Sequence, residues 1–250
     1  MKMTDAERFS LACSTVVGSE RERTSVGLLQ EKTVHAVLKV CYEPNTAYHE
    51  VKCGRFVVDV CRDGHIFEIQ SRNFASMQKK IAALLEEYTV TVVHPIPHER
   101  FIVWVDPETG ALSPRRRVIR RGRFTDAGRE LFGILPFIGH PNFAVELLLI
   151  DMVEYRLRDG RGAEKKKGSH RYDRYPTALA AACRLDSLAS YRALLPDLPS
   201  PFTAKDFRRA IAGGPRVSPT LLNLLCRLGI VERVGKAGNA FLYTVTECAE

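Results

Sequence analysis

Residues 56–70 constrain the fold more than any other stretch of the chain. Two short runs of apolar and β-branched residues flank an Asp63-Gly64 pair, and this pattern predicts a β-hairpin with a tight turn. An acid interrupts each run, Asp59 in the first and Glu68 in the second. Burying two carboxylates in paired strands is costly unless something neutralises them, and a divalent cation is the usual solution. The hairpin is therefore a candidate metal site.

The spacing of these acids resembles a nuclease motif. Asp59 is followed, after eight intervening residues, by the triplet from Glu68 to Gln70. This is similar to the PD-(D/E)xK nuclease superfamily, in which one strand supplies an acid and the next an acid-x-Lys triplet. The likeness covers roughly residues 25–95. Val58 stands in place of the proline and Gln70 in place of the lysine; because glutamine carries no charge and takes no proton, the departure bears on mechanism and efficiency more than on the fold.

The resemblance implies a fold and a set of ligands. The fold would be α/β (α+β), a restriction-endonuclease-like mixed sheet flanked by helices. Asp59 and Glu68 would hold Mg²⁺ or Mn²⁺, and Gln70 would orient the attacking water. Glu31, on the predicted first helix, matches the place of an auxiliary acid of the superfamily, with a solvated helix charge as the alternative.

Glu50 is a further candidate acid. It belongs to a short strand predicted directly before the hairpin, next to the strand that carries Asp59. We therefore expect Glu50 to complete the metal shell or to act as a base. The alternative is an exposed polar side chain on an edge strand.

Hydrophobic periodicity predicts the elements around the hairpin. A helix is expected over about 25–42, another with Met77, Ile81 and Leu84 on its buried side, and a β-branched strand over 89–93. Helix, three strands, helix and strand is the order of the superfamily core. Topology therefore supports the motif independently.

A basic connecting region is expected over 111–170. Within it, residues 115–123 contain six arginines and no acid, and a block like this commonly contacts a phosphate backbone, although some are solvated surface. A helix is expected over 127–138, while 143–157 suits either a buried strand or a helix. The arginines assigned to DNA binding are Arg115, Arg116, Arg117, Arg120 and Arg121.

Residues 171–250 are expected to form a separate, mainly helical domain. A hairpin with a basic, glycine-rich tip follows the last of its helices, and this order resembles a winged helix-turn-helix domain. The predicted elements are helices at 177–194, 203–211 and 218–228 and strands at 230–234 and 241–245. Thr203 and Ser218 are expected to cap the second and third of these helices.

In such domains the last helix enters the major groove of DNA and the loop touches the backbone. Arginine and asparagine can read guanine and adenine edges. A protein-binding module is the alternative. The predicted contacts are Arg216, Thr220, Asn223, Arg227 and Lys236.

Composition indicates the class of partner. A formal charge of +8 over 250 residues favours a polyanion. Seven scattered cysteines without a Cys-x-x-Cys pair suggest reduced thiols in a cytoplasmic protein. Residues 1–24 lack the apolar region of a signal peptide and are expected to be a loosely held lead-in, and no stretch is long enough to span a membrane.

These observations favour a metal-dependent DNA endonuclease with a nuclease-like core at 25–110 and a DNA-binding module at its C-terminus. One alternative is a non-catalytic DNA-binding or regulatory protein that retains the nuclease-like fold. Another is purely structural: Asp59 and Glu68 are paired with arginine or lysine, and the C-terminal domain mediates a homodimer.

Overall fold

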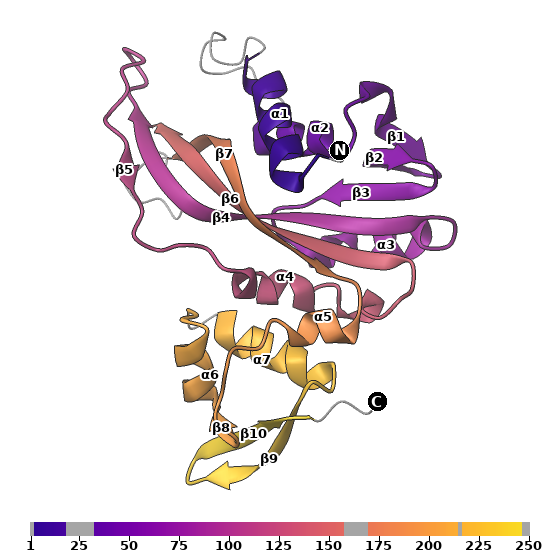
Figure 1. Ribbon diagram of the computed structural model, residues 1–250, viewed down its shortest axis with the longest axis vertical. Coiled ribbons are helices and arrows are strands. Elements are labelled where there is room, and N and C mark those ends of the chain that lie inside the picture. The colour runs from indigo at the N-terminus through magenta and orange to yellow at the C-terminus, as the bar shows by residue number, and fades with distance from the viewer. Residues whose placement is uncertain (1–2, 19–32, 158–169, 215–216, 247–250) are drawn as a thin grey trace.

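A single large mixed sheet forms the centre of the molecule (Figure 1). The computed structural model describes residues 3–18, 33–157, 170–214 and 217–246. The strand order is β1-β2-β3-β4-β6-β7, with β5 paired to β4. The strands are β1 (His49–Cys53), β2 (Phe56–Arg62), β3 (His65–Ile69), β4 (Thr89–Val105), β5 (Arg116–Arg117), β6 (Phe143–Leu157) and β7 (His170–Leu185).

Helices cover both faces of this sheet. Figure 1 shows α1 (Asp5–Gly18) and α2 (Thr33–Tyr42) above it and α3 (Gln78–Leu84) and α4 (Gly128–Phe132) below it. Each pair of helices covers a separate apolar core, because the apolar residues on both faces of this mixed sheet must be buried. Short 3₁₀ turns connect the elements at η1 (Thr46–Tyr48), η2 (Phe74–Met77), η3 (Phe124–Ala127) and η4 (Leu135–Phe137).

The predicted hairpin and the order of elements around it are confirmed. β2 and β3 pair antiparallel, and the turn residues Asp63 and Gly64 both have positive φ, 50° and 77°, as a two-residue turn of the favoured hand requires. α3 then carries the chain across the lower face, so β4 runs parallel to β3. The strand expected near 89–93 is the first part of β4.

The helix predicted over 177–194 is wrong. β7 occupies the first half of this range and pairs antiparallel with β6, and only α5 (Leu188–Arg192) is helical. Alanine-rich sequence favours a helix locally, but pairing with β6 and packing against α1 and α2 override that preference. The ambiguous segment 143–157 is a strand.

Two other expectations need correction. The described part of the N-terminal lead-in, residues 3–18, is not loosely held, because α1 buries Phe9 to 1% exposure and Ala12 to 2%. The helix expected over 127–138 is divided into η3, α4 and η4, since the chain turns at Gly133 and Pro136 has no N–H to continue a helix. Of the helix predicted over 25–42, the described part begins at Thr33.

The C-terminal part consists of helices and a small sheet. The Thr203 hydroxyl accepts the N–H of Asp206 and caps the second helix as expected. Ser218 is not a cap; it lies inside the last helix, and its hydroxyl donates to the carbonyl of Gly214. The elements are α6 (Ala204–Ala210), α7 (Val217–Arg227), β8 (Phe202–Thr203), β9 (Val231–Ala237) and β10 (Ala240–Val245), with sheet order β8-β10-β9.

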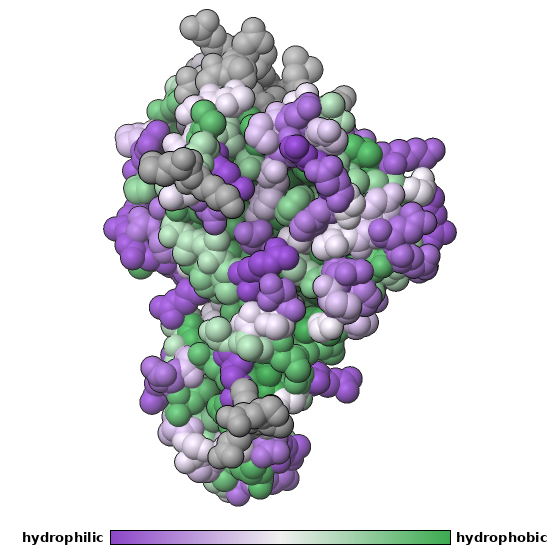
Figure 2. Space-filling view, turned by 45° about the vertical axis from the view of Figure 1, so that its right-hand side comes forward, coloured by the Kyte–Doolittle hydropathy of each residue, from purple (hydrophilic) through white to green (hydrophobic). Residues whose placement is uncertain are grey.

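Close packing joins this part to the large sheet. α7 lies against α4 so tightly that a Cβ placed on Gly128 would come within 2.7 Å of the Leu221 Cβ. Figure 2 shows the C-terminal part as the lower lobe, with apolar side chains gathered where it meets the rest of the molecule. Among the described residues, no helix has the length and apolar character needed to cross a membrane.

The burial of Phe9 predicts that α1 contributes to stability. We expect Phe9→Ala to lower the free energy of unfolding by about 3 kcal/mol, because a large side chain leaves a cavity in a closed core. Leu11→Ala, on the same helix but at a position that is 59% exposed, should change it by less than about 0.5 kcal/mol. Urea denaturation of both variants measures the difference, and equal small effects would show that α1 is dispensable.

Candidate active site

The acids of the hairpin lie where β2 and β3 separate. Backbone pairing between the strands runs from Arg62 and His65 to Val60 and Phe67. At the next position, the Asp59 carboxylate accepts the backbone N–H of Ile69 at 2.7 Å. The Asp59 side chain thus accepts this hydrogen bond between β2 and β3 in place of a backbone carbonyl.

His35 from α2 approaches the same carboxylate. Its Nε2 lies 3.3 Å from Oδ2 of Asp59. Burial raises the pKa of Asp59, but the hydrogen bond and charge of His35 and the N–H of Ile69 outweigh burial and hold that pKa below its ordinary value. Asp59 is therefore an ionised carboxylate at neutral pH.

Glu68 has the opposite environment. Its side chain is only 8% exposed, and Lys80 from α3 places Nζ at 2.6 Å from Oε1. The Lys80 ammonium also donates to the carbonyl of Val57 at 2.7 Å. Burial and then the negative charge of Asp59 raise the pKa of Glu68 above its ordinary value, although Lys80 opposes them.

The two carboxyl groups therefore have pKa values shifted in opposite directions. Neighbouring titratable groups with this property are typical of sites that divide proton donation and charge stabilisation between two acids. A bound cation would reduce the repulsion between the Asp59 and Glu68 carboxylates, which contributes to the raised pKa of Glu68.

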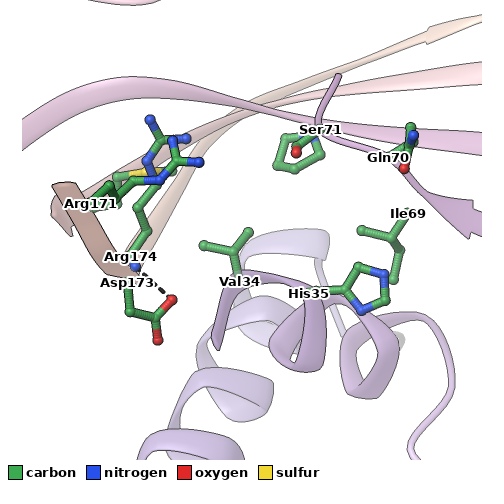
Figure 3. Close-up of a pocket in the computed structure, with 10 residues that line it drawn as sticks. Val34, His35, Ile69, Gln70, Ser71, Arg171, Asp173 and Arg174 are labelled. Carbon is green, nitrogen blue, oxygen red and sulfur yellow. Dashed lines mark hydrogen bonds between the residues drawn. The ribbon is translucent and has the colours of Figure 1, made fainter. Parts of the chain in front are cut away.

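Gln70 lines a pocket beside the hairpin. The pocket has a volume of about 180 Å³, and His35, Ile69 and Gln70 form one end of it. Arg171 and Arg174, from β7, lie at the other end, as Figure 3 shows. An anionic group in this pocket would lie between the two arginines and the end of β3.

The other two predicted acids are not placed with this pair. The Glu50 carboxylate pairs with Lys39 of α2 at 3.0 Å and is 68% exposed. Its backbone has a φ of 53°, which breaks the regular alternation of β1. Glu31 lies outside the described residues.

The arginine run is partly neutralised by acids from elsewhere in the chain. Arg117 and Arg121 both pair with Glu99, and Arg120 pairs with Asp126. The remaining predicted contacts in the run are exposed, on β5 or directly before it. Charge density along the sequence therefore overstates the charge that is available to a ligand.

The predicted contacts on α7 share one exposed side of the helix only in part. Asn223 and Arg227 are exposed and four residues apart, whereas Thr220 is half-buried. Lys236 is exposed on β9. Arg216 lies outside the described residues.

Sequence reasoning did not select His35 and Lys80, which contact the two acids. Lys80 follows Met77 by three residues and precedes Leu84 by four, and both are buried. It therefore lies at the border of the buried side, a position from which a long cationic side chain can reach inward. This spacing is the sequence feature from which an inward-reaching Lys80 could have been predicted.

Two adjacent carboxylates fit a magnesium ion. Mg²⁺ keeps several waters and is commonly held by one or two protein carboxylates and the phosphates of its substrate. Asp59 and Glu68 supply that number of oxygen ligands. Within the part of the chain that the structure describes, no cluster of three or more His, Cys, Asp and Glu side chains is arranged for a metal, so a bound ion would rely on water or substrate for its other ligands.

Residues 32–186 match the model of a domain of unknown function (DUF8091). This range is more than half of the chain, and the chain belongs to that family. It extends from the start of α2 to the end of β7, so it contains both acids, Lys80 and the pocket and excludes the C-terminal part. Comparison with curated proteins found no match, and comparison with solved structures found none either.

The Glu68–Lys80 pair predicts a pH-dependent loss of stability in Lys80→Ala. Without the ammonium, ionised Glu68 is buried and unpaired, so its pKa rises further and the free energy of unfolding falls by about 3 kcal/mol at neutral pH. A raised carboxyl pKa in the folded state favours folding at low pH, and the deficit should therefore shrink as the pH falls toward the ordinary pKa of glutamate.

Urea denaturation at pH 7 and pH 5 measures this change. Lys79→Ala removes the same charge from the exposed neighbouring position and should have little effect at either pH. A Lys80→Ala deficit that is absent, or equal at both pH values, would contradict the pairing.

Proposed function

We propose that the protein is a metal-dependent phosphodiesterase that cleaves DNA. The observation that carries this proposal is the grouping of three charged side chains at the end of the hairpin, where Lys80 contacts Glu68 and the charge of Asp59 acts on Glu68, next to a pocket with arginines at its far end. Two acids and a cation beside an anion-binding pocket suit phosphoryl transfer, which depends on positioning and charge stabilisation.

Lys80 supplies the cation that the motif lacks. In the acid-x-Lys pattern the lysine would stand at position 70, where this chain has glutamine. The ammonium instead reaches Glu68 from α3. In that position Lys80 stabilises negative charge on the phosphoryl group, while the Gln70 amide orients the attacking water through hydrogen bonds.

The two carboxylates would hold Mg²⁺ or Mn²⁺. When bound, the ion would polarise a phosphoryl oxygen and lower the pKa of a coordinated water. Asp59 is suited to this role because His35 and the N–H of Ile69 keep it ionised. Glu68 would exchange part of its interaction with Lys80 for the metal.

The C-terminal part supports a nucleic acid as the substrate. Its order of helix, strand, two helices and hairpin resembles a winged helix-turn-helix domain. Asn223, Arg227 and Lys236 are exposed on its last helix and hairpin, as groups that bind DNA must be. α7 packs directly against α4, so DNA bound there would be held at a fixed position relative to the sheet.

A specific observation favours a second candidate, a non-catalytic DNA-binding protein with a nuclease-like fold. Each acid already has a protein partner, Asp59 with His35 and Glu68 with Lys80. Protein side chains therefore already contact both carboxylates without a metal. This candidate predicts DNA binding that does not depend on metal and is not accompanied by cleavage.

Cleavage of supercoiled and linear DNA by wild-type protein and Asp59→Asn tests the proposal. We expect nicking in Mg²⁺ or Mn²⁺, none in EDTA, and a rate lowered at least about a hundredfold by Asp59→Asn, because the substitution removes a charged ligand while conserving its shape. Asp63→Asn, at a turn position that is 86% exposed, is the matched control and should cut normally.

Gel retardation of the same proteins separates the two candidates. Retained DNA binding with lost cleavage in Asp59→Asn supports the phosphodiesterase. If wild-type protein retards DNA equally in metal and in EDTA and never cuts it, the non-catalytic candidate is correct.

A further inference from the structure

Glu154, on β6, lies at the centre of a cluster of arginines. Its side chain is 3% exposed, and its carboxylate oxygens lie 2.9 Å from Arg174, 3.4 Å from Arg156 and 3.6 Å from Arg100. These arginines come from the adjacent strands β7, β6 and β4. One carboxylate balances one guanidinium, so among the described residues the charge of Arg100 and Arg174 together exceeds that of Glu154 in a partly buried place.

Arg171 adds to this surplus. Among the described residues it has no carboxylate partner within ion-pair distance, whereas the nearby acid Asp173 is occupied. The Asp173 carboxylate accepts the hydroxyl of Thr33 at 2.5 Å and the backbone N–H of Arg174 at 2.7 Å. Burial and then the charge of Arg171 lower the pKa of Arg174, although Glu154 opposes them, so Arg171 lies close enough to add to the positive charge around Arg174.

The surplus charge faces two adjoining pockets. Arg171 and Arg174 line the 180 Å³ pocket that ends at Gln70, and Arg174 and Arg100 line a neighbouring pocket of about 310 Å³. Both pockets share Ser71, so they meet beside the end of β3. Figure 3 shows the guanidinium groups of Arg171 and Arg174 close to each other and across the pocket from His35 and Gln70.

Besides the polar groups at its two ends and Asp173, whose carboxylate already accepts hydrogen bonds from Thr33 and Arg174, the smaller pocket has an apolar wall. Val34, Pro95 and Met152 lie along it. A ligand that matches the pocket therefore has an anionic group for the guanidinium end and an apolar or weakly polar body for these walls. A phosphate with its attached sugar has this character, and guanidinium groups bind phosphate oxygens through paired hydrogen bonds.

We propose that Arg171 and Arg174 form a subsite for a backbone phosphate of a nucleic-acid strand, in the pocket next to Asp59 and Glu68. The inference rests on the proposed phosphodiesterase function, since it assigns this phosphate to the strand that is cut. The subsite holds a phosphate close to the one that reacts and so fixes the position of the strand at the hairpin. Arg171, which has no carboxylate partner among the residues that the structure describes, contributes most of the binding, and Arg174 is positioned by Glu154.

Equilibrium binding of a short fluorescent single-stranded DNA, measured by anisotropy in EDTA, tests the subsite without cleavage. Arg171→Gln should weaken binding about tenfold, because a charge-assisted contact is lost, and should reduce the slope of log K against log salt by about one. Arg184→Gln on the same strand, where the guanidinium pairs with Asp186, is the matched control and should behave as wild type.

Arg171→Lys distinguishes a lost contact from a misfolded protein. It keeps the charge but not the fork geometry, so it should restore the salt slope and only part of the affinity. Equal binding by Arg171→Gln and Arg184→Gln would overturn the proposal.

Competition with inorganic phosphate separates the two sources of the anion. If phosphate binding depends on Arg171 but DNA binding does not, the pocket serves a free phosphate and the proposal fails. If DNA binding depends on Arg171 but the wild-type protein never cuts DNA, the subsite is supported and only the phosphodiesterase function is rejected.

Discussion

The ion pair between Glu68 and Lys80 is the interaction on which the candidate site depends. A carboxylate that is almost fully buried must be balanced, and here the balance comes from a helix on the lower face of the sheet. His35 contacts Asp59 from α2 on the upper face. The two acids therefore fix the positions of both helices relative to the hairpin, and the same contacts that stabilise this end of the sheet determine which carboxyl group is ionised.

The distribution of arginines shows why charge must be judged in three dimensions. The run at 115–123 is the densest in the sequence, yet Glu99 and Asp126 pair with three of its members. Arg171 and Arg174 are inconspicuous in sequence, but the pairing of β7 with β6 brings them to Glu154 and the arginines around it. An anion is attracted to the cluster whose charge exceeds that of its own acids, and this cluster borders the pocket beside the hairpin.

Local chemistry explains what the sequence could predict. The hairpin followed from alternation and an Asp-Gly turn, and Thr203 was recognisable as a cap; both are decided by a few neighbouring residues. β7 was predicted as a helix because its alanines favour one locally, whereas its strand pairing is formed with residues far away in the chain. Lys80 and His35 were not predicted because their contacts are also with residues distant in the chain. Periodicity indicates the buried side of a helix but does not indicate which acid of the sheet a side chain at its edge contacts. Glu50 lies on a strand as predicted, but its positive φ changes the direction of the side chain.

We propose that Asp59 and Glu68 jointly bind a catalytic metal ion. Anomalous diffraction from crystals soaked in Mn²⁺ tests it most directly, because the ion is located without reference to activity. We predict a peak between the two carboxylates, coordinated by both, with the Lys80 ammonium moved away from Glu68. An unchanged Glu68–Lys80 ion pair, with no peak at this position in saturating Mn²⁺, would contradict the claim and favour the purely structural role of the two acids.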